Sequence, residues 1–146
     1  MPETALPRGY ILSFDYGLKR IGVAVGQATT GTATPLETVR HGREPDWGAI
    51  GRLVADWRPA LALVGLPLGV DGEETPMSGA ARRFGAALGE RFSIPVEYID
   101  ERLTSRAAEA RFVEQRASGT LRRKHADRVD AIAAQIMLEN WLHART

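Results

Sequence analysis

The sequence predicts one α/β domain with a mixed five-stranded sheet, helices on both of its faces and a loose tail at residues 1–8. Two observations carry this prediction. Three short segments with strand-like apolar patterns follow one another at the start, which is typical of a meander. After residue 45 the apolar spacing becomes helical, and strands and helices then alternate, as in sheets covered by helices. The length of 146 residues suits a single domain, 1–146, with one core.

The strands of the meander are expected at residues 10–15, 20–26 and 32–39. The first is an apolar run that ends in an acid (YILSFD). The second alternates and is rich in β-branched residues (RIGVAVG). Pro35 interrupts the third and indicates a strand at or near an edge, because proline cannot donate a hydrogen bond to a neighbouring strand.

Helix signals dominate the rest of the chain. Asp46 is expected to cap a helix that runs to about Trp57, where Pro59 follows. Thr75 and Pro76 form the next helix start, with a capping side chain followed by a proline in the first turn. The remaining expected elements are strands at 61–65 and 95–99, a glycine- and proline-bearing loop at 67–79, helices ending near Phe92 and at about 104–116 and 126–144, and a basic linker at 117–124.

Composition excludes several classes of protein. The chain has no cysteine, which removes disulfides and thiolate metal sites. No apolar run approaches the roughly 18 residues that span a bilayer, and the N-terminus lacks an apolar signal core, so we expect a cytoplasmic protein without a membrane partner. The net charge is only +1, but residues 116–128 are locally basic. That segment suits nucleic-acid phosphates, or alternatively forms a solvated face.

Several acidic residues lie next to apolar segments, at positions where a charge is not needed for solubility. Asp15 closes the first strand, and Asp100 and Glu101 close the fifth. Asp130 borders an apolar stripe of the last helix, and Asp127 lies one turn earlier. Carboxylates that converge repel one another unless a cation or a proton joins them. Hard ions such as Mg²⁺ take oxygen ligands, and two ions about 4 Å apart can hydrolyse a phosphodiester.

Each acid also has an ordinary structural alternative. Asp15 could bond the backbone of the turn at Gly17, since aspartate often accepts from a residue two positions on. Glu101 could pair with Arg102, and Asp130 could pair with a basic neighbour or lie on a solvated face. The joint pattern indicates metal-dependent chemistry more strongly than any single residue does.

Four segments together resemble the motifs of the YqgF/RuvX family. They are FDYGLKRIGVA at 14–24, GLPL at 65–68 followed by Asp-Gly at 71–72, DERLT at 100–104, and VDAIAA at 129–134. The resemblance runs from residue 12 to about 142 with the motifs in the family's order. It implies an RNase H-like fold related to RuvC-type Holliday junction resolvases. It also implies the family's usual assignment, nuclease trimming of the 5′ end of precursor 16S rRNA in ribosome biogenesis.

The resemblance implies a catalytic trio of Asp15, Glu101 and Asp130 that holds Mg²⁺ or Mn²⁺, and Asp127 is a candidate fourth ligand. The residues expected to contact nucleic-acid phosphates are basic neighbours of these acids, namely Lys19, Arg20, Arg102, Arg122, Arg123 and Lys124. For Lys19 and Arg20 the alternative is a solvated hairpin turn, and for Arg102 it is a structural ion pair.

These observations leave four alternative functions to compare. The first is a nuclease acting on structured RNA, such as precursor rRNA or a ribosomal particle. The second is a resolvase acting on branched DNA, which needs two symmetric sites and hence a homodimer, whereas the first works as a monomer or homodimer. The third is a non-catalytic nucleic-acid-binding module. The fourth, an actin-like ATPase, requires a second lobe for which the chain is too short.

Overall fold

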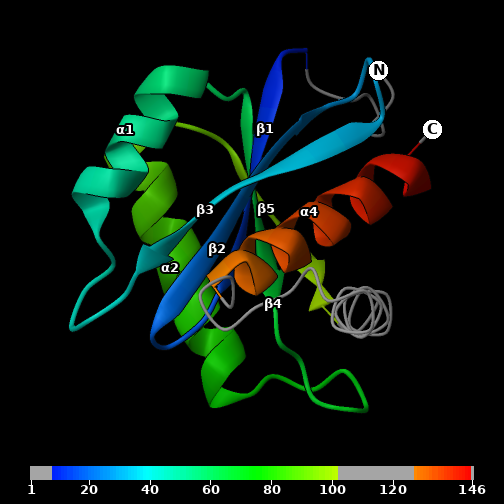
Figure 1. Cartoon of the computed structure of the whole chain (residues 1–146). Coiled ribbons are helices and arrows are strands. Elements are labelled where there is room, and N and C mark those ends of the chain that lie inside the picture. Colours follow the sequence, from blue (N-terminus) through cyan, green and yellow to red (C-terminus); the bar gives the residue numbers. More distant parts are fainter. Residues whose placement is uncertain (1–7, 102–126, 146) are drawn as a thin grey trace, which may run out of the picture.

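The computed structural model describes residues 8–101 and 127–145 and confirms the α/β fold with a mixed sheet. The strands in this part of the chain are β1 (Tyr10–Tyr16), β2 (Arg20–Gln27), β3 (Thr32–Arg40), β4 (Leu61–Leu66) and β5 (Val96–Asp100). They form one sheet in the order β3-β2-β1-β4-β5 (Figure 1). The first three pair antiparallel as a meander, and β4 and β5 are parallel to β1 and to each other.

Strand boundaries differ from the expected ones by one residue at most. Tyr16 pairs with Ile21, so β1 continues past Asp15. Asp15 therefore lies inside a hydrogen-bonded strand and not at its last position, because the hairpin pairing extends to the turn. Pro35 lies in β3, an outer strand of the sheet, as expected for a residue that cannot donate to a partner.

The helices start where their capping residues predict. Asp46 accepts a hydrogen bond from the backbone N–H of Ala49 at the start of α1 (Trp47–Trp57). Thr75 and Ser78 form a capping box at the start of α2 (Pro76–Phe92). The last described helix is α4 (Asp127–Ala144). The helix expected at 104–116 and the linker expected at 117–124 lie outside the described residues, as do residues 1–7 of the expected tail.

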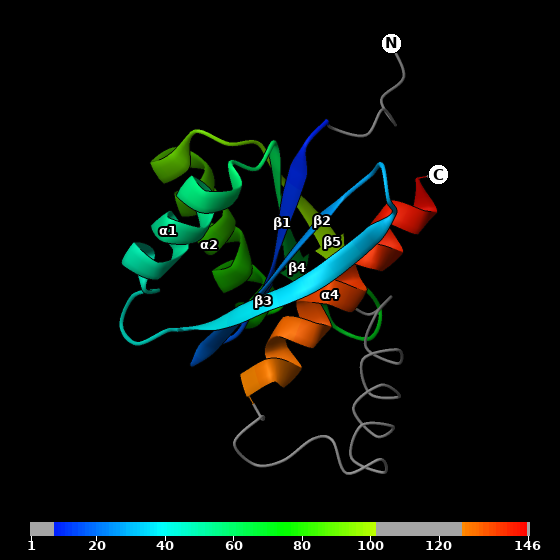
Figure 2. The same cartoon turned by 45° about the horizontal axis from the view of Figure 1, so that its top comes forward.

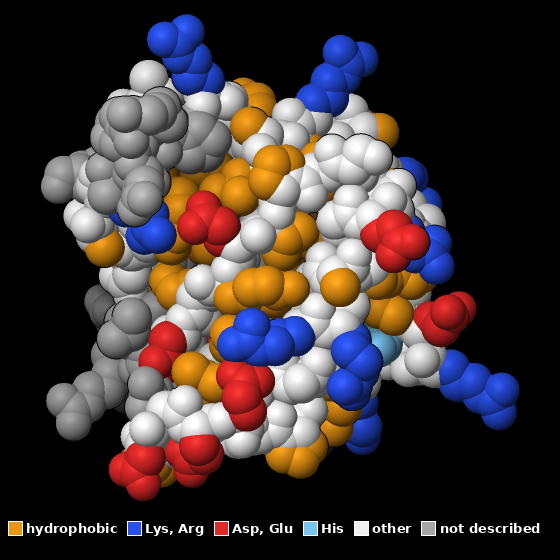
Figure 3. All heavy atoms as spheres, turned by 180° about the vertical axis from the view of Figure 1, so that it is seen from behind, with side chains coloured by type: hydrophobic (Ala, Val, Ile, Leu, Met, Phe, Trp, Pro, Cys, Tyr) orange, Lys and Arg blue, Asp and Glu red, His pale blue; other side chains and the backbone are white. Residues whose placement is uncertain are grey.

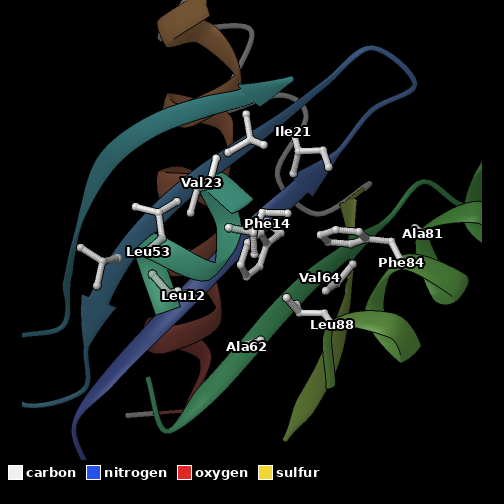
Figure 4. Close-up of a cluster of buried hydrophobic side chains, with 14 of the residues drawn as sticks. Leu12, Phe14, Ile21, Val23, Leu53, Ala62, Val64, Ala81, Phe84 and Leu88 are labelled. Atoms are coloured by element: carbon white, nitrogen blue, oxygen red, sulfur yellow. The ribbon is translucent and has the colours of Figure 1, made fainter. Parts of the chain in front are cut away.

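The described elements form three layers, with α1 and α2 on one face of the sheet and α4 on the other (Figure 2). Successive side chains of a strand point to opposite faces of the sheet, so apolar side chains form a core on each face. The core toward α1 and α2 is built around Phe14, Val64 and Phe84 (Figure 4). The core toward α4 takes the neighbouring strand positions, such as Ile11 and Leu63, against helix residues that include Met137, Leu138 and Leu142. Among the described helices, none combines the length and the apolar character that crossing a membrane requires.

Helix α4 lies against the sheet at very short range because β2 offers it a residue without a side chain. A Cβ atom added to Gly22 would overlap the backbone carbonyl of Asp130. On the neighbouring strand, the buried Ser13 hydroxyl donates to the carbonyl oxygen of Ala134 at 2.9 Å. These two contacts fix both the height of α4 above the sheet and its position along it.

Side chains of α4 also bind the outer strand β3. Gln135 donates from Nε2 to the carbonyl oxygen of Ala33 at 3.0 Å, and a Glu139 carboxylate oxygen accepts from the Ala33 N–H at 3.4 Å. An outer strand exposes backbone groups that can pair with other chains, and such groups are blocked when a helix covers them. Here α4 satisfies two of these groups.

A candidate active site of converging carboxylates

Asp15 projects from β1 toward α4. Side chains alternate along a strand, so Ile11, Ser13 and Asp15 share one face. Ile11 belongs to the core under α4, and Ser13 bonds Ala134 of that helix. Asp15 is the next position on this face, and its partner in the sheet register is Gly22. The central strand of the sheet thus places a carboxyl group beside the close approach of α4.

Glu101 reaches the same face from the far edge of the sheet. It follows β5, and β4 separates β5 from β1. A Cβ atom added to Gly65 of β4 would lie 2.5 Å from Glu101 Oε1 and 2.7 Å from the Met137 sulfur, so the Glu101 side chain occupies the space above this glycine. Because Gly65 has no side chain, Glu101 crosses β4 and hydrogen-bonds the Asp15 carboxyl.

The two carboxyl groups share a proton. Burial raises the pKa of Asp15 above its usual range, and the hydrogen bond from Glu101 partly opposes this rise. For Glu101, burial, then the hydrogen bond to Asp15, and then the charges of Asp15 and Asp100 raise the pKa to about 9. Near neutral pH the Glu101 carboxyl therefore keeps its proton and donates it to the Asp15 carboxyl group. Adjacent buried carboxyl groups behave in this way when no cation lies between them.

Asp130 lies on the same side of the sheet and is neutralised by a different group. Its backbone sits against Gly22, the register partner of Asp15. Its Oδ2 atom lies 2.9 Å from Nε of Arg20, which projects from the start of β2. Among the described residues, no three acidic or histidine side chains are arranged to hold one metal ion. The described arrangement is thus a proton-sharing pair beside an arginine-neutralised aspartate.

The donor set nevertheless suits a hard divalent cation. Asp15 and Glu101 present carboxylate oxygens at one point, and their raised pKa values reflect the energy cost of placing two charges there. A cation would take the place of the shared proton. Asp130 would join it by exchanging Arg20 for the cation, since a partly exposed ion pair of this kind is weak.

Other expected site residues lie at the margin of the described structure. Lys19 and Arg20 are exposed beside the acids. Asp127 begins α4, but its side chain is not among those described. The remaining expected phosphate contacts, Arg102, Arg122, Arg123 and Lys124, fall outside the described residues. On the face seen in Figure 3, basic and acidic side chains are interspersed, so the described part of that face forms no continuous basic field.

Sequence reasoning missed the residues that position the acids. Gly22 and Gly65 were noted only as members of motifs, and Ser13 only as part of an apolar strand. A serine inside a buried apolar run does carry a signal, since a buried hydroxyl needs a partner, and here the partner is α4. The two glycines carry no such local signal, because their role depends on groups far away in the sequence.

The shared proton predicts a pH dependence of stability. Because the pKa of Glu101 is about 9 in the folded chain and near 4.5 as a free side chain, the folded state binds more protons between these values. Its free energy of unfolding should therefore fall as pH rises from about 5 to 9. Thermal unfolding in EDTA should show a melting temperature that falls more steeply for the wild type than for Glu101→Gln, which keeps the neutral form. Parallel curves for the two proteins would contradict the shared proton.

The chain resembles known proteins over nearly its whole length. The family model described as RuvX, Holliday junction resolvase, matches residues 9–144. A Legionella pneumophila protein named "Putative pre-16S rRNA nuclease" is 45% identical over 138 residues, which cover 94% of this chain and 97% of the relative. A Pseudomonas putida protein of the same name is 46% identical over 138 residues, covering 93% and 96%.

Solved structures show the same fold. Thermus thermophilus RuvC in complex with a Holliday junction substrate superposes with a TM-score of 0.56 at 21% identity, covering 94% of this chain and 96% of that one. At this identity the likeness concerns the fold alone, which is the RNase H-like α/β fold.

Proposed function

The chain belongs to the RuvX family and is a nuclease, and from this premise we propose that it processes the 5′ end of precursor 16S rRNA with a divalent metal ion bound at Asp15, Glu101 and Asp130. The observation that carries the proposal is the Asp15–Glu101 carboxyl pair, assembled from two strands that β4 separates. Burying two acids together is unfavourable in a metal-free fold, and such strain is usually kept at functional sites.

When bound, Mg²⁺ or Mn²⁺ would supply an activated water and stabilise the charge that develops on the scissile phosphate. Asp15 and Glu101 would lose their shared proton and bind the cation as carboxylates. Asp130 would release Arg20 and add a third oxygen ligand, with Asp127 as a candidate fourth. Arg20, once released, would be available to a substrate phosphate beside the acids.

Basic side chains near these acids would hold the substrate backbone. Lys19 and Arg20 extend from the turn that follows Asp15 and are exposed. The proposal extends this role to Arg102, Arg122, Arg123 and Lys124, which neighbour Glu101 and Asp130 in the sequence. Phosphate contacts of this kind position a strand without reading its bases.

We propose precursor rRNA and not DNA as the substrate because of the names of the similar curated proteins. The curated proteins named as pre-16S rRNA nucleases match nearly the whole chain at 43–46% identity. A second candidate, cutting of four-way DNA junctions, is favoured by the description of the family model. Precursor rRNA is a cytoplasmic substrate in bacteria, so the proposed place of action is the cytoplasm.

Cleavage of two substrates side by side tests the proposal. A 5′-extended precursor 16S rRNA and a four-way DNA junction are incubated with the wild type in Mg²⁺, in Mn²⁺ and in EDTA, with Asp130→Asn as the control for contaminating nucleases. We expect metal-dependent cutting of the RNA by the wild type alone. Cutting of the junction alone, by a protein that sediments as a dimer, would favour the resolvase. No metal-dependent cutting of either substrate would exclude both activities and leave a binding module.

A further inference from the structure

A basic cavity of about 410 Å³ lies at the open end of the β2–β3 hairpin, where β2 begins and β3 ends. Its described lining residues are Lys19, Arg20, Thr38, Arg40, His41 and Gly42, and none of these is acidic. The volume falls in the range of pockets that enclose a small organic molecule, so a sugar–phosphate segment has room in it. Arg20 connects this cavity to the carboxylates through its contact with Asp130.

Two arginines face each other across the hairpin at this cavity. Arg20 pairs with Arg40 in the register of β2 and β3, and Gly22 pairs with Thr38. Directly paired residues of antiparallel strands point to the same face, so Arg20 and Arg40 both project on the side of α4. Like charges placed directly opposite one another destabilise a sheet. An anion that binds between them removes this repulsion.

The charges at this cavity are only partly balanced. Asp130 pairs with Arg20, whose side chain is still 53% exposed. Within residues 8–101 and 127–145, no ion pair of the Lys19 or Arg40 side chain is observed. With respect to the described residues, the Lys19 and Arg40 side chains are therefore open to a negatively charged ligand.

His41 ties this cavity to the strand that carries Asp15. Its Nδ1 atom lies 2.8 Å from the carbonyl oxygen of Gly17, which directly follows β1. A carbonyl oxygen can only accept, so Nδ1 carries the hydrogen and donates it. The His41 backbone N–H also donates to the carbonyl oxygen of Lys19 at 3.0 Å. These two bonds hold the end of β3 against the turn after Asp15, so the cavity and the acids form one connected unit.

We propose that this cavity binds a backbone phosphate of the nucleic-acid strand that passes the Asp15–Glu101 pair, with Arg40 as its main contact and Lys19 and Arg20 beside it. The inference rests on the proposed function, because it identifies the ligand as the substrate of that site. The inference adds two residues to the site, Arg40 at the end of β3 and His41 directly after it. No pattern in the sequence connects these two residues with the acids. A phosphodiester fits better than a free base, since the described lining residues offer three cations and, apart from the His41 imidazole, no aromatic ring.

The salt dependence of RNA binding tests this inference. Binding of a fluorescein-labelled single-stranded RNA of mixed sequence is measured in EDTA at several KCl concentrations for the wild type and Arg40→Gln. One lost phosphate contact should weaken binding roughly fivefold at low salt and reduce the slope of log K against log salt by about one. Lys19→Gln should change the slope in the same direction. Arg40→Lys should restore most of the affinity, because a phosphate accepts a point charge.

Arg52→Gln is the matched control, because Arg52 is an exposed residue of α1 on the opposite face of the sheet and its loss changes the net charge equally. An unchanged slope in Arg40→Gln, or an equal loss in Arg52→Gln, would overturn the inference even if the wild type cuts precursor rRNA in Mg²⁺. If the wild type cuts neither substrate while the Arg40→Gln slope still falls, the proposed function fails and the phosphate site stands.

Discussion

Asp15→Asn is expected to lower metal-dependent cleavage by at least about a hundredfold and, at the same time, to raise the melting temperature of the metal-free protein. The loss of activity follows because several kcal/mol of transition-state stabilisation depend on a correctly held metal ion, and each 1.36 kcal/mol is about tenfold in rate. The gain in stability follows because a neutral amide relieves the burial of the Asp15 charge beside Glu101. We expect a rise of roughly 3 °C, which corresponds to about 1 kcal/mol.

Adding Mg²⁺ separates the two effects. The wild type should melt at a higher temperature in Mg²⁺ than in EDTA, because an ion that binds only the folded state stabilises it. Asp15→Asn should show little difference between the two buffers. A variant that loses activity but melts below the wild type in EDTA would mean that Asp15 is a structural residue, as in the alternative that bonds it to the turn at Gly17.

Gly65→Ala tests whether the position of the Glu101 carboxyl group beside Asp15 matters, and not only its charge. Its added Cβ atom would lie 2.5 Å from Glu101 Oε1 and 2.7 Å from the Met137 sulfur, which are both ends of flexible side chains. The fold should therefore adapt while Glu101 moves away from Asp15. Cleavage should fall by about ten- to a hundredfold, as for other residues that orient metal ligands. Wild-type cleavage by Gly65→Ala would show that Glu101 does not need its path across β4.

Gly22→Ala is expected to destabilise the fold by about 3 kcal/mol or more, because the new methyl group would overlap backbone atoms of Asp130 and Ala131. Backbone atoms cannot turn aside as a side chain can, so α4 must move away from the sheet. For a chain of this size the melting temperature should drop by about 10 °C. Cleavage should fall too, since Asp130 moves with the helix.

Gly51→Ala provides the control for Gly22→Ala. Gly51 lies inside α1, and an added Cβ atom there would make ordinary contact with Phe92 at 3.6 Å. Alanine favours helix over glycine, so this variant should melt at or above the wild-type temperature. If Gly22→Ala melts within about 2 °C of the wild type, α4 does not sit on β2 as described.

The fold could be predicted because its signals are local. Apolar runs and alternation identified the strands, helical spacing identified α1, and capping side chains such as Asp46 and Thr75 marked the starts of α1 and α2. Each signal lies within about ten residues of the element that it predicts. Within residues 8–101 and 127–145, the errors lie at strand ends, such as the extension of β1 through Tyr16, where pairing with a neighbouring strand decides the boundary.

The acids of the candidate site were found for a similar reason. A carboxyl group that closes an apolar strand, or borders an apolar helix stripe, differs from its surroundings in the sequence itself. The motifs around Asp15, Glu101 and Asp130 then indicated the family, which the comparisons confirm. The metal-binding role of the trio stays a prediction that the variants above test.

By itself, the sequence determined the strand and helix pattern, the family and the identity of the candidate acids, because these depend on residue type and short-range spacing. Tertiary structure alone decided that Glu101 crosses β4 above Gly65 to reach Asp15, that Arg20 neutralises Asp130, and that Arg40 faces Arg20. Each of these contacts joins residues that are 20 to 110 positions apart. The sheet register and the close packing of α4 against Gly22 bring these residues together. Both result from packing of the whole chain and not from any local pattern.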